Sequence, residues 1–169
     1  MEKKLKIRII IATIAVLAAV LVILFSSGAF GFIVNGAKFV TADGRYSAKI
    51  FYYTKEYTLK EKEITASPFG TVSISSVKSD DNGVIAEFLF EGDWGLSRGK
   101  TLSARPVFNA ARDYIMTVKA CDSEFSFVSQ TVSRSSVTAI YRLENANIEE
   151  YKSADFTLSN VVVNDYERK

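Results

Sequence analysis

Residue types that carry out chemistry are scarce in this chain. Histidine is absent from its 169 residues. This absence removes the commonest general base, the commonest metal ligand, and every serine–histidine or cysteine–histidine pair. No glycine-rich phosphate-binding motif occurs, and the adjacent acids Glu149 and Glu150 are expected to point in different directions on a surface helix. We therefore expect a protein that is not an enzyme and that needs no cofactor and no metal ion.

The strongest candidates for binding lie between residues 94 and 112. Trp94, the only tryptophan, stands between glycines in an expected loop, where its ring could stack on a sugar, a protein or a lipid headgroup. Arg98, Lys100, Arg105 and Arg112 form a run of cations with no acid between them. Such a run would suit an anionic cell-wall polymer, a headgroup or an acidic partner surface. Two structural alternatives stay open: the ring folds back over one end of the domain, and the cations form a solvated face.

Three weaker candidates have ordinary structural explanations. Residues 80–82, Asp-Asp-Asn, offer oxygens to Ca²⁺, but such a site needs about six oxygens, so a turn is the better interpretation. Cys121 is the only cysteine, which excludes a disulfide within the chain. We expect it to be a small core or strand-end residue rather than a reactive thiol or an intermolecular bridge. Four tyrosines could form an aromatic binding surface or pack across strands: Tyr46, Tyr52, Tyr53 and Tyr57.

The rest of the chain is organised around an apolar segment at residues 9–25. This segment carries no charge, and Thr13 is its only polar side chain. As a helix it would span about 26 Å, and the mildly apolar continuation to residue 34 would complete a bilayer core. Residues 1–8 contain four cations and one acid. Because cationic flanks stay in the cytoplasm, the pattern predicts a cytoplasmic tail at 1–8, a transmembrane signal anchor with a short juxtamembrane segment at 9–34, and an extracytoplasmic domain at 35–169.

A cleaved signal peptide is the competing interpretation of this segment. Ser27, Gly28 and Ala29 provide the small residues that a signal peptidase requires. The apolar run is longer than the usual 7 to 15 residues of a signal peptide, which favours an uncleaved anchor. Both interpretations export the rest of the chain, either to the outer face of the cell membrane or into the medium.

The charge balance of the exported domain excludes nucleic acid as a partner. The chain has 21 Lys and Arg against 19 Asp and Glu, and residues 1–8 hold four of the cations and one acid, which leaves 17 against 18 outside. A near-neutral domain has no electrostatic basis for binding nucleic acid. We expect the membrane as one partner, through residues 9–25, and a protein or an envelope polymer as another.

The exported part has the pattern of short antiparallel strands. A hairpin is predicted with strands at 38–42 and 45–53 around residues 43 and 44. Residues 55–66 fit a charged edge strand or a short solvated helix, and the edge strand is favoured. The alternation changes parity near residues 75 and 76, which predicts a bulge, and residues 80–83 predict a turn. Residues 84–90 form the most apolar strand and should be central to the core.

The remaining strands follow at regular spacing. They are predicted at residues 100–108, 113–120, 124–131, 136–143 and 155–164. Pro106 places the first of these at a sheet edge. Asn147 can cap a short helix at 148–153, and residues 165–169 are expected to be a solvated end. The prediction is an all-β fold, an antiparallel immunoglobulin-like β-sandwich preceded by one transmembrane helix.

Two features resemble a known group of proteins. Residues 67–70, Ser-Pro-Phe-Gly, lead into an alternating strand, and a short acidic helix precedes the final strand. In these respects residues 37–164 resemble the immunoglobulin-like ectodomains that Gram-positive bacteria tether by one helix, several of which have no assigned function. Some are outer halves of anti-sigma factors, but that role requires a folded cytoplasmic domain, which residues 1–8 cannot form. The anchor, the near-neutral domain and the absence of catalytic groups predict an envelope binding or assembly module, and residues 27–29 leave open a cleaved and secreted structural subunit.

Overall fold

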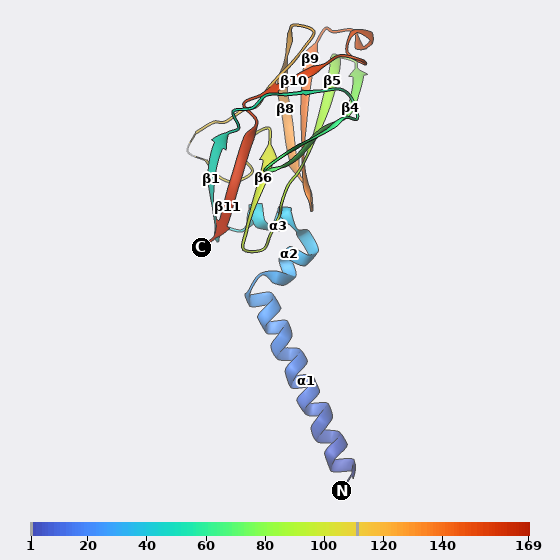
Figure 1. Cartoon of the computed structure of the whole chain (residues 1–169). Helices are drawn as coiled ribbons and strands as arrows, with labels where there is room; N and C mark the ends of the chain where they lie inside the picture. The colour runs from blue at the N-terminus through green and yellow to red at the C-terminus, as the bar shows by residue number, and fades with distance from the viewer. Residues whose placement is uncertain (1, 111) are drawn as a thin grey trace.

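The computed structural model describes residues 2–110 and 112–169, and it consists of a long helix that projects from a β-rich domain (Figure 1). Helix α1 covers Glu2–Ser26, followed by the short helices α2, Ala29–Asn35, and α3, Ala37–Ala42. None of the side chains in the 18-residue apolar stretch Ile9–Ser26 is buried. The predicted apolar helix at the N-terminus is therefore confirmed.

Glycines set the two breaks between the helices. Gly28 has φ of 77° and ends the long helix, and Gly36 has φ of 52° between the two short helices. These left-handed conformations strain residues that carry a Cβ atom. The chain therefore turns twice before it enters the β domain.

In the described part of the chain the strands form two antiparallel sheets. The smaller sheet has the order β1–β11–β6, and the larger sheet has the order β2–β10–β7–β8–β9–β5–β4–β3. The strands are β1 Tyr46–Tyr52, β2 Tyr57–Leu59, β3 Ile64–Ser67, β4 Gly70–Asp80, β5 Gly83–Glu91, β6 Arg98–Ser103, β7 Thr117–Ala120, β8 Ser123–Val132, β9 Ser136–Glu144, β10 Phe156–Ser159 and β11 Val162–Arg168. The predicted class, antiparallel sheets packed together behind one apolar helix, is confirmed.

The larger sheet follows the predicted pattern closely around its centre. In β5 the alternating residues Val84, Ala86, Phe88 and Phe90 are fully buried, as expected for a strand between two neighbours. The register between β4 and β5 shifts at Ile74, which confirms the predicted bulge. The two strands are joined by the predicted turn at residues 80–83.

The predicted edge strand at residues 55–66 is two strands rather than one. β2 and β3 lie at opposite ends of the eight-stranded sheet. The amide of Lys62, between them, donates to the Ile74 carbonyl oxygen at 2.9 Å, so the sheet curls back towards its other end. This barrel-like curvature was not evident from strand spacing.

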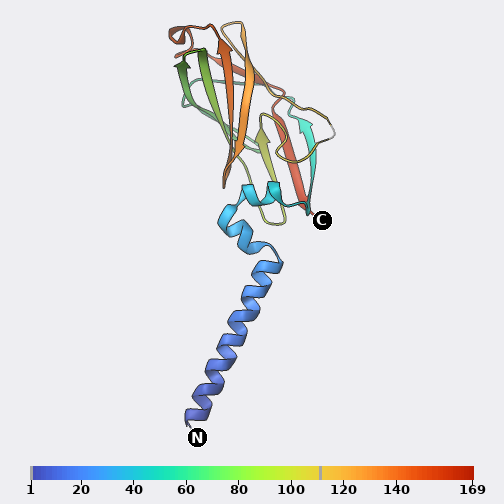
Figure 2. The same ribbon diagram turned by 180° about the vertical axis from the view of Figure 1, so that it is seen from behind.

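Two predictions about the ends of the domain are wrong. Residues 38–42 belong to α3 and not to a hairpin strand. The helix starts after Gly36, where the Ala37 amide donates to the Arg134 carbonyl oxygen, and Val40 packs in a cluster with Tyr46 and Tyr166. Residues 165–169 are not a solvated end, since β11 runs to Arg168 and Tyr166 is 1% exposed. The helices and the last strand therefore share a second, smaller core, and Figure 2 shows α3 beneath the sheets.

Smaller details divide between confirmation and correction. β6 is a sheet edge as predicted, although it ends at Ser103, before Pro106. Strand β7 starts later than predicted, at Thr117, because residues 104–110 and 112–116 lie outside the strands. The Gln130 side chain accepts from the amides of Ala104 and Arg105 at 3.0 and 2.9 Å and holds the start of this stretch. Asn147 caps a helical turn, Ile148–Glu150, by accepting from the Glu149 amide. Cys121 is exposed in the turn between β7 and β8, at a strand end rather than in the core.

Candidate functional site

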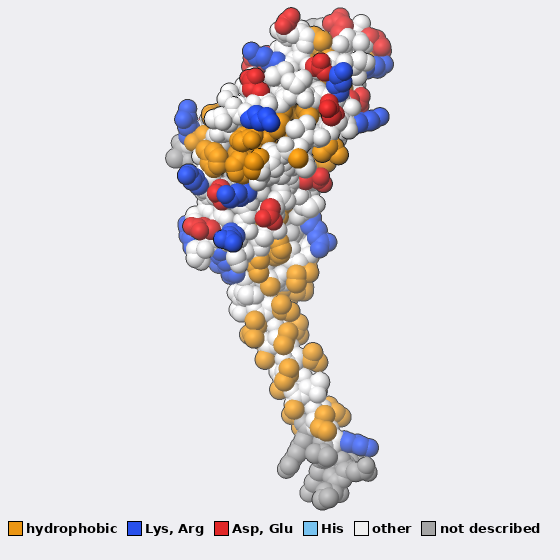
Figure 3. All heavy atoms as spheres, viewed as in Figure 1, with side chains coloured by type: hydrophobic (Ala, Val, Ile, Leu, Met, Phe, Trp, Pro, Cys, Tyr) orange, Lys and Arg blue, Asp and Glu red, His pale blue; other side chains and the backbone are white. Residues whose placement is uncertain are grey.

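A hollow of about 760 Å³ lies on one face of the three-stranded sheet. Two cross-strand rows form its floor: Lys49, Asp165 and Lys100, then Ser47, Glu167 and Arg98. Pro68, Phe69 and Gly70 from the β3–β4 turn form a wall, and Asp93 lies at the rim. Figure 3 shows hydrophobic side chains gathered on this side of the domain, with cations and acids around them. We call this site the hollow.

The floor of the hollow is the part of this sheet face that lies beyond the main core. The next row on the same face is Phe51, Val163 and Leu102, and these residues belong to or pack against the main core. Alternation along a strand keeps the charged rows on this same face. The Phe69 ring stands edge-on to Phe51 with centroids 6.0 Å apart and closes the core at this boundary. Beyond the Phe69 ring, the two charged rows on this face line the open hollow.

Charge in the hollow is balanced. Its lining contains three cations and three acids: Lys49, Arg98, Lys100, Asp93, Asp165 and Glu167. Lys100 Nζ lies 3.2 Å from the Asp165 carboxylate and 5.8 Å from the centre of the Phe69 ring. A lining of both signs beside an apolar wall suits a polar segment with groups of both charges better than a polyanion.

The four cations expected to act together belong to two different hollows. Arg98 and Lys100 line the first, whereas Arg105 and Arg112 line a second hollow of about 500 Å³. Arg105 is paired with Asp113 at 2.6 Å and lies over the Phe127 ring. Because this guanidinium is already paired, the continuous basic surface suggested by the sequence does not form.

Trp94 packs between the two cores. Its ring centre is 5.7 Å from that of Tyr166, and it contacts both hydrophobic clusters. Its indole N–H is buried without a hydrogen-bond partner among the described residues. The ring therefore supports the floor of the hollow from behind and does not line it, as in the alternative of a ring folded back over the domain.

Tyr166 is the residue that sequence reasoning missed. Its hydroxyl accepts from the Gly95 amide at 2.8 Å and donates to the Gly95 carbonyl oxygen at 3.0 Å. Burial raises the pKa of the Tyr166 hydroxyl to about 12, so the group stays neutral at ordinary pH. The alternation of Val162, Asn164 and Tyr166 in the sequence could have predicted that the last strand continues past residue 164.

Residues 95–99 read Gly-Leu-Ser-Arg-Gly, a match to the Gly-x-Ser-x-Gly pattern of serine nucleophiles that the sequence-based expectation did not include. A nucleophile elbow follows a strand and opens a helix. Here the segment leads from a loop into β6. A Cβ atom at Gly95 would lie 2.3 Å from the Arg98 carbonyl oxygen, and one at Gly99 would lie 2.4 Å from the Tyr166 hydroxyl. Close packing therefore explains both glycines.

The same stretch contains a Ser-x-x-Lys spacing, and a second one occurs in β4. In each case the lysine lies near a carboxylate instead, at 3.2 Å for Lys100 and Asp165 and at 3.9 Å for Lys78 and Glu87. The hydrogen bonds of the described residues join neither serine hydroxyl, Ser97 nor Ser75, to its lysine. Neither Ser-x-x-Lys sequence therefore forms a nucleophile–base pair among the described residues.

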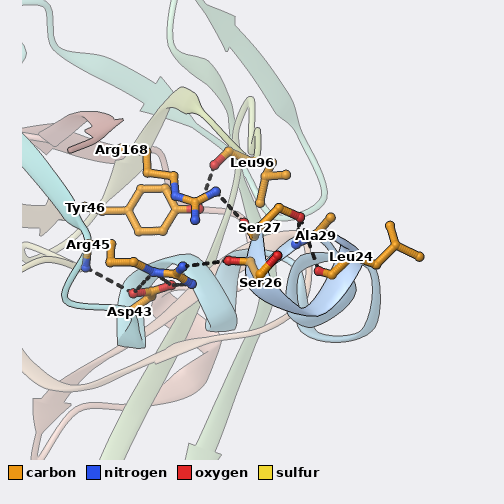
Figure 4. Close-up of polar contacts among 9 residues, drawn as sticks. All are labelled: Leu24, Ser26, Ser27, Ala29, Asp43, Arg45, Tyr46, Leu96 and Arg168. Atoms are coloured by element: carbon orange, nitrogen blue, oxygen red, sulfur yellow. Dashed lines mark hydrogen bonds and ion pairs between the residues drawn. The ribbon is translucent and has the colours of Figure 1, made fainter. Parts of the chain in front are cut away.

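A second group of contacts, made by arginine side chains, joins the helices to the β domain (Figure 4). At the end of the long helix, Arg45 donates to the Ser26 carbonyl oxygen at 3.5 Å and Arg168 donates to that of Ser27. Arg134 donates to the Ile33 carbonyl oxygen of α2 at 2.7 Å. Cations at helix C-termini complement both the unpaired carbonyls and the helix dipole. We call these three arginines and their carbonyl partners the collar.

Two further contacts fix the collar. Asp43 Oδ2 accepts from Arg45 at 2.6 Å, and this guanidinium lowers the pKa of the Asp43 carboxyl. The amide of Ala37 donates to the Arg134 carbonyl oxygen at 2.8 Å. A Cβ atom at Gly36 would lie 2.1 Å from that oxygen, so only glycine fits there.

Among the described residues no group of three or more His, Cys, Asp or Glu side chains is close enough to hold a metal ion. Comparisons of the chain with models of protein families, with curated proteins and with solved structures found no match.

Proposed function

We propose that this chain is a single-pass membrane protein whose N-terminus is cytoplasmic and whose β domain is an extracytoplasmic, non-catalytic binding or assembly module of the cell envelope. The observation that supports the proposal is an apolar helix whose residues 9–26 are not buried and whose C-terminal end is joined to the β domain by the collar. A helix of this composition is unfavourable in water at about 25 cal/mol for each Å² of apolar surface. A bilayer removes that cost.

The collar supports an uncleaved anchor over a secreted subunit. The small residues that a signal peptidase would read include Gly28, which is buried where the collar meets the helix. Cleavage beside Ala29 would remove the Ser26 and Ser27 carbonyl partners of Arg45 and Arg168. In a secreted subunit Arg168 would lose its Ser27 partner, and Arg45 would keep its ion pair with Asp43 but lose the Ser26 carbonyl oxygen.

The hollow is the proposed binding surface, and its partner is a protein segment or an envelope polymer. Balanced charge beside Phe69 favours a partner that carries both signs and an apolar group. The absence of histidine from the sequence supports a role in binding rather than catalysis.

The immunoglobulin-like assignment of the domain is part of this proposal. Two packed antiparallel sheets and the turn at Ser67 and Gly70 support it. The sizes of the sheets, three and eight strands, differ from the four and three of the constant-type immunoglobulin fold. An experimentally determined strand order would decide whether the domain is a curled variant of that sandwich.

The test has two stages. In the first, the full chain is recovered from cell membranes and medium and its intact mass is measured. We expect a membrane-bound species that begins at Met1. A soluble species that begins near residue 30 would refute the anchor and support the secreted subunit.

The second stage tests the hollow with a photo-crosslinking residue. Benzoylphenylalanine is placed at position 49, in the hollow, or at position 128, an exposed position on β8. We expect crosslinks to one protein or polymer from position 49 and not from position 128. Equal labelling from both positions would refute the hollow as the binding surface.

A further inference from the structure

We propose that α2, Lys38 and the collar form a second membrane contact, in which α2 lies in the interfacial layer and Lys38 and the collar arginines face anionic lipid headgroups. This inference rests on the membrane anchoring proposed above. It assigns the short helix a ligand, the headgroup region of a bilayer with net negative charge, in place of a role as a passive linker.

The first observation is that α2 has a covered side and an open side. Phe39 packs so closely against the covered side that a Cβ atom at Gly31 would lie 2.5 Å from its ring. Phe30, Ile33 and Val34 on the open side are 42%, 56% and 51% exposed. Their spacing of three and four residues places them on one face of the helix. Helix α3 therefore covers one side of α2 and leaves an apolar face of α2 turned outwards.

The second observation is that this face continues the surface of the membrane helix. The Phe25 and Phe30 rings, one on each side of the Gly28 turn, have centroids 4.6 Å apart. The apolar stretch Ile9–Ser26 has 18 residues, about 27 Å of helix, which nearly fills a hydrocarbon core of about 30 Å. The core therefore ends where the chain turns, so α2 lies at the level of the interface, between α1 and the β domain (Figure 1).

The third observation is charge at this level. No charged residue occurs between Arg8 and Lys38. Beyond α2 come Lys38 and the collar arginines Arg45, Arg134 and Arg168, against Asp43. Lys38 is exposed, and the Arg45 side chain is 45% exposed although it binds Asp43. Cations next to an apolar interfacial face are the arrangement that binds anionic membranes. A protein partner is less favoured, because the bilayer already adjoins the same surface.

The experiment uses the full chain in lipid nanodiscs that contain spin-labelled lipids. In a Cys121→Ser background, an environment-sensitive fluorophore is attached to Val34→Cys, with Val22→Cys as the reference inside the bilayer and Val128→Cys as the reference in water. Because the quenching spin labels are attached to the lipids, quenching reports contact of the fluorophore with the membrane and not with protein. We expect the probes at 22 and 34 to be quenched several-fold more than the probe at 128.

The failures of the two proposals are distinguishable. A probe at 34 that behaves like the one at 128, while the probe at 22 is quenched, would overturn the interfacial contact and leave the anchor intact. A probe at 22 that is not quenched would overturn the anchor itself, and this inference with it.

A second arm tests the charge. We expect at least twofold more quenching at position 34 in nanodiscs of phosphatidylglycerol than in nanodiscs of phosphatidylcholine. Lys38→Glu should remove this difference, and Lys55→Glu, at an exposed position between β1 and β2, should keep it. Equal quenching in the two lipids would overturn the assignment of the cations to anionic headgroups.

Discussion

Two buried tyrosines allow a sharp test of how the domain is held together. Tyr166 and Tyr57 are 1% and 2% exposed, so their rings lose about equal contact with water on folding. The Tyr166 hydroxyl makes two hydrogen bonds to Gly95. The Tyr57 hydroxyl is buried with no hydrogen-bond partner in the described residues, although it lies near Ser67 and Tyr53. Replacing each tyrosine with phenylalanine changes only this hydroxyl.

The two substitutions should therefore have different effects. Tyr166→Phe leaves both backbone groups of Gly95 unpaired in a half-buried loop, which costs about 2 kcal/mol. Tyr57→Phe removes a hydroxyl that is buried without a well-formed hydrogen bond, so the free energy of unfolding should stay the same or rise by up to about 1 kcal/mol.

The assay is equilibrium unfolding of the full chain by urea in detergent micelles. Trp94 fluorescence is the signal, because this is the only tryptophan and its ring centre lies 5.7 Å from that of Tyr166. With a slope of about 2 kcal/mol per molar urea, Tyr166→Phe should lower the midpoint by about 1 M. Equal losses from both variants would refute the reasoning, since the partners of the hydroxyls would then not decide the result.

Two further predictions concern the collar. Gly36→Ala should loosen the helices from the β domain, because the new Cβ atom would meet the Arg134 carbonyl oxygen at 2.1 Å, whereas Gly44→Ala, with no atom within 4 Å, is the control; faster amide hydrogen exchange over residues 27–42 in the first variant alone would confirm this. The pKa of Asp43 is lowered by its hydrogen bond to Arg45, so the stabilisation that it provides is complete above about pH 4 and is lost as the pH falls through the lowered pKa. Protection of the same segment against exchange, relative to the unfolded chain at the same pH, should fall only in acid, and Asp43→Asn should lower it already at neutral pH.

Local pattern was sufficient for elements whose burial alternates regularly. The central strand at 84–90, the bulge near residue 75 and the cap at Asn147 followed from side-chain period, parity and hydrogen-bonding capacity. The missed elements depend on distant residues. Residues 38–42 carry β-prone side chains, but Gly36 and the carbonyl oxygen of Arg134 direct them into a helix.

The site was less predictable than the fold for the same reason. The sequence grouped Arg98, Lys100, Arg105 and Arg112 because no acid separates them in the chain. In the structure, acids from other segments lie beside them, such as Asp165 beside Lys100. Cross-strand register decides charge balance, and a single sequence does not specify which strands pair.

The last and first strands of the domain link the collar, the second core and the hollow residue by residue. In β11, Arg168 binds the end of α1, Tyr166 packs in the second core, and Asp165 lines the hollow. At the start of β1, Arg45 just before the strand also binds the end of α1, and Tyr46, its first residue, also packs in the second core. The lowest row of the hollow is therefore one strand position, about 3.4 Å, from the collar. If the collar lies at the bilayer interface, as proposed, the hollow opens close to the membrane, and a partner must reach it along the membrane surface.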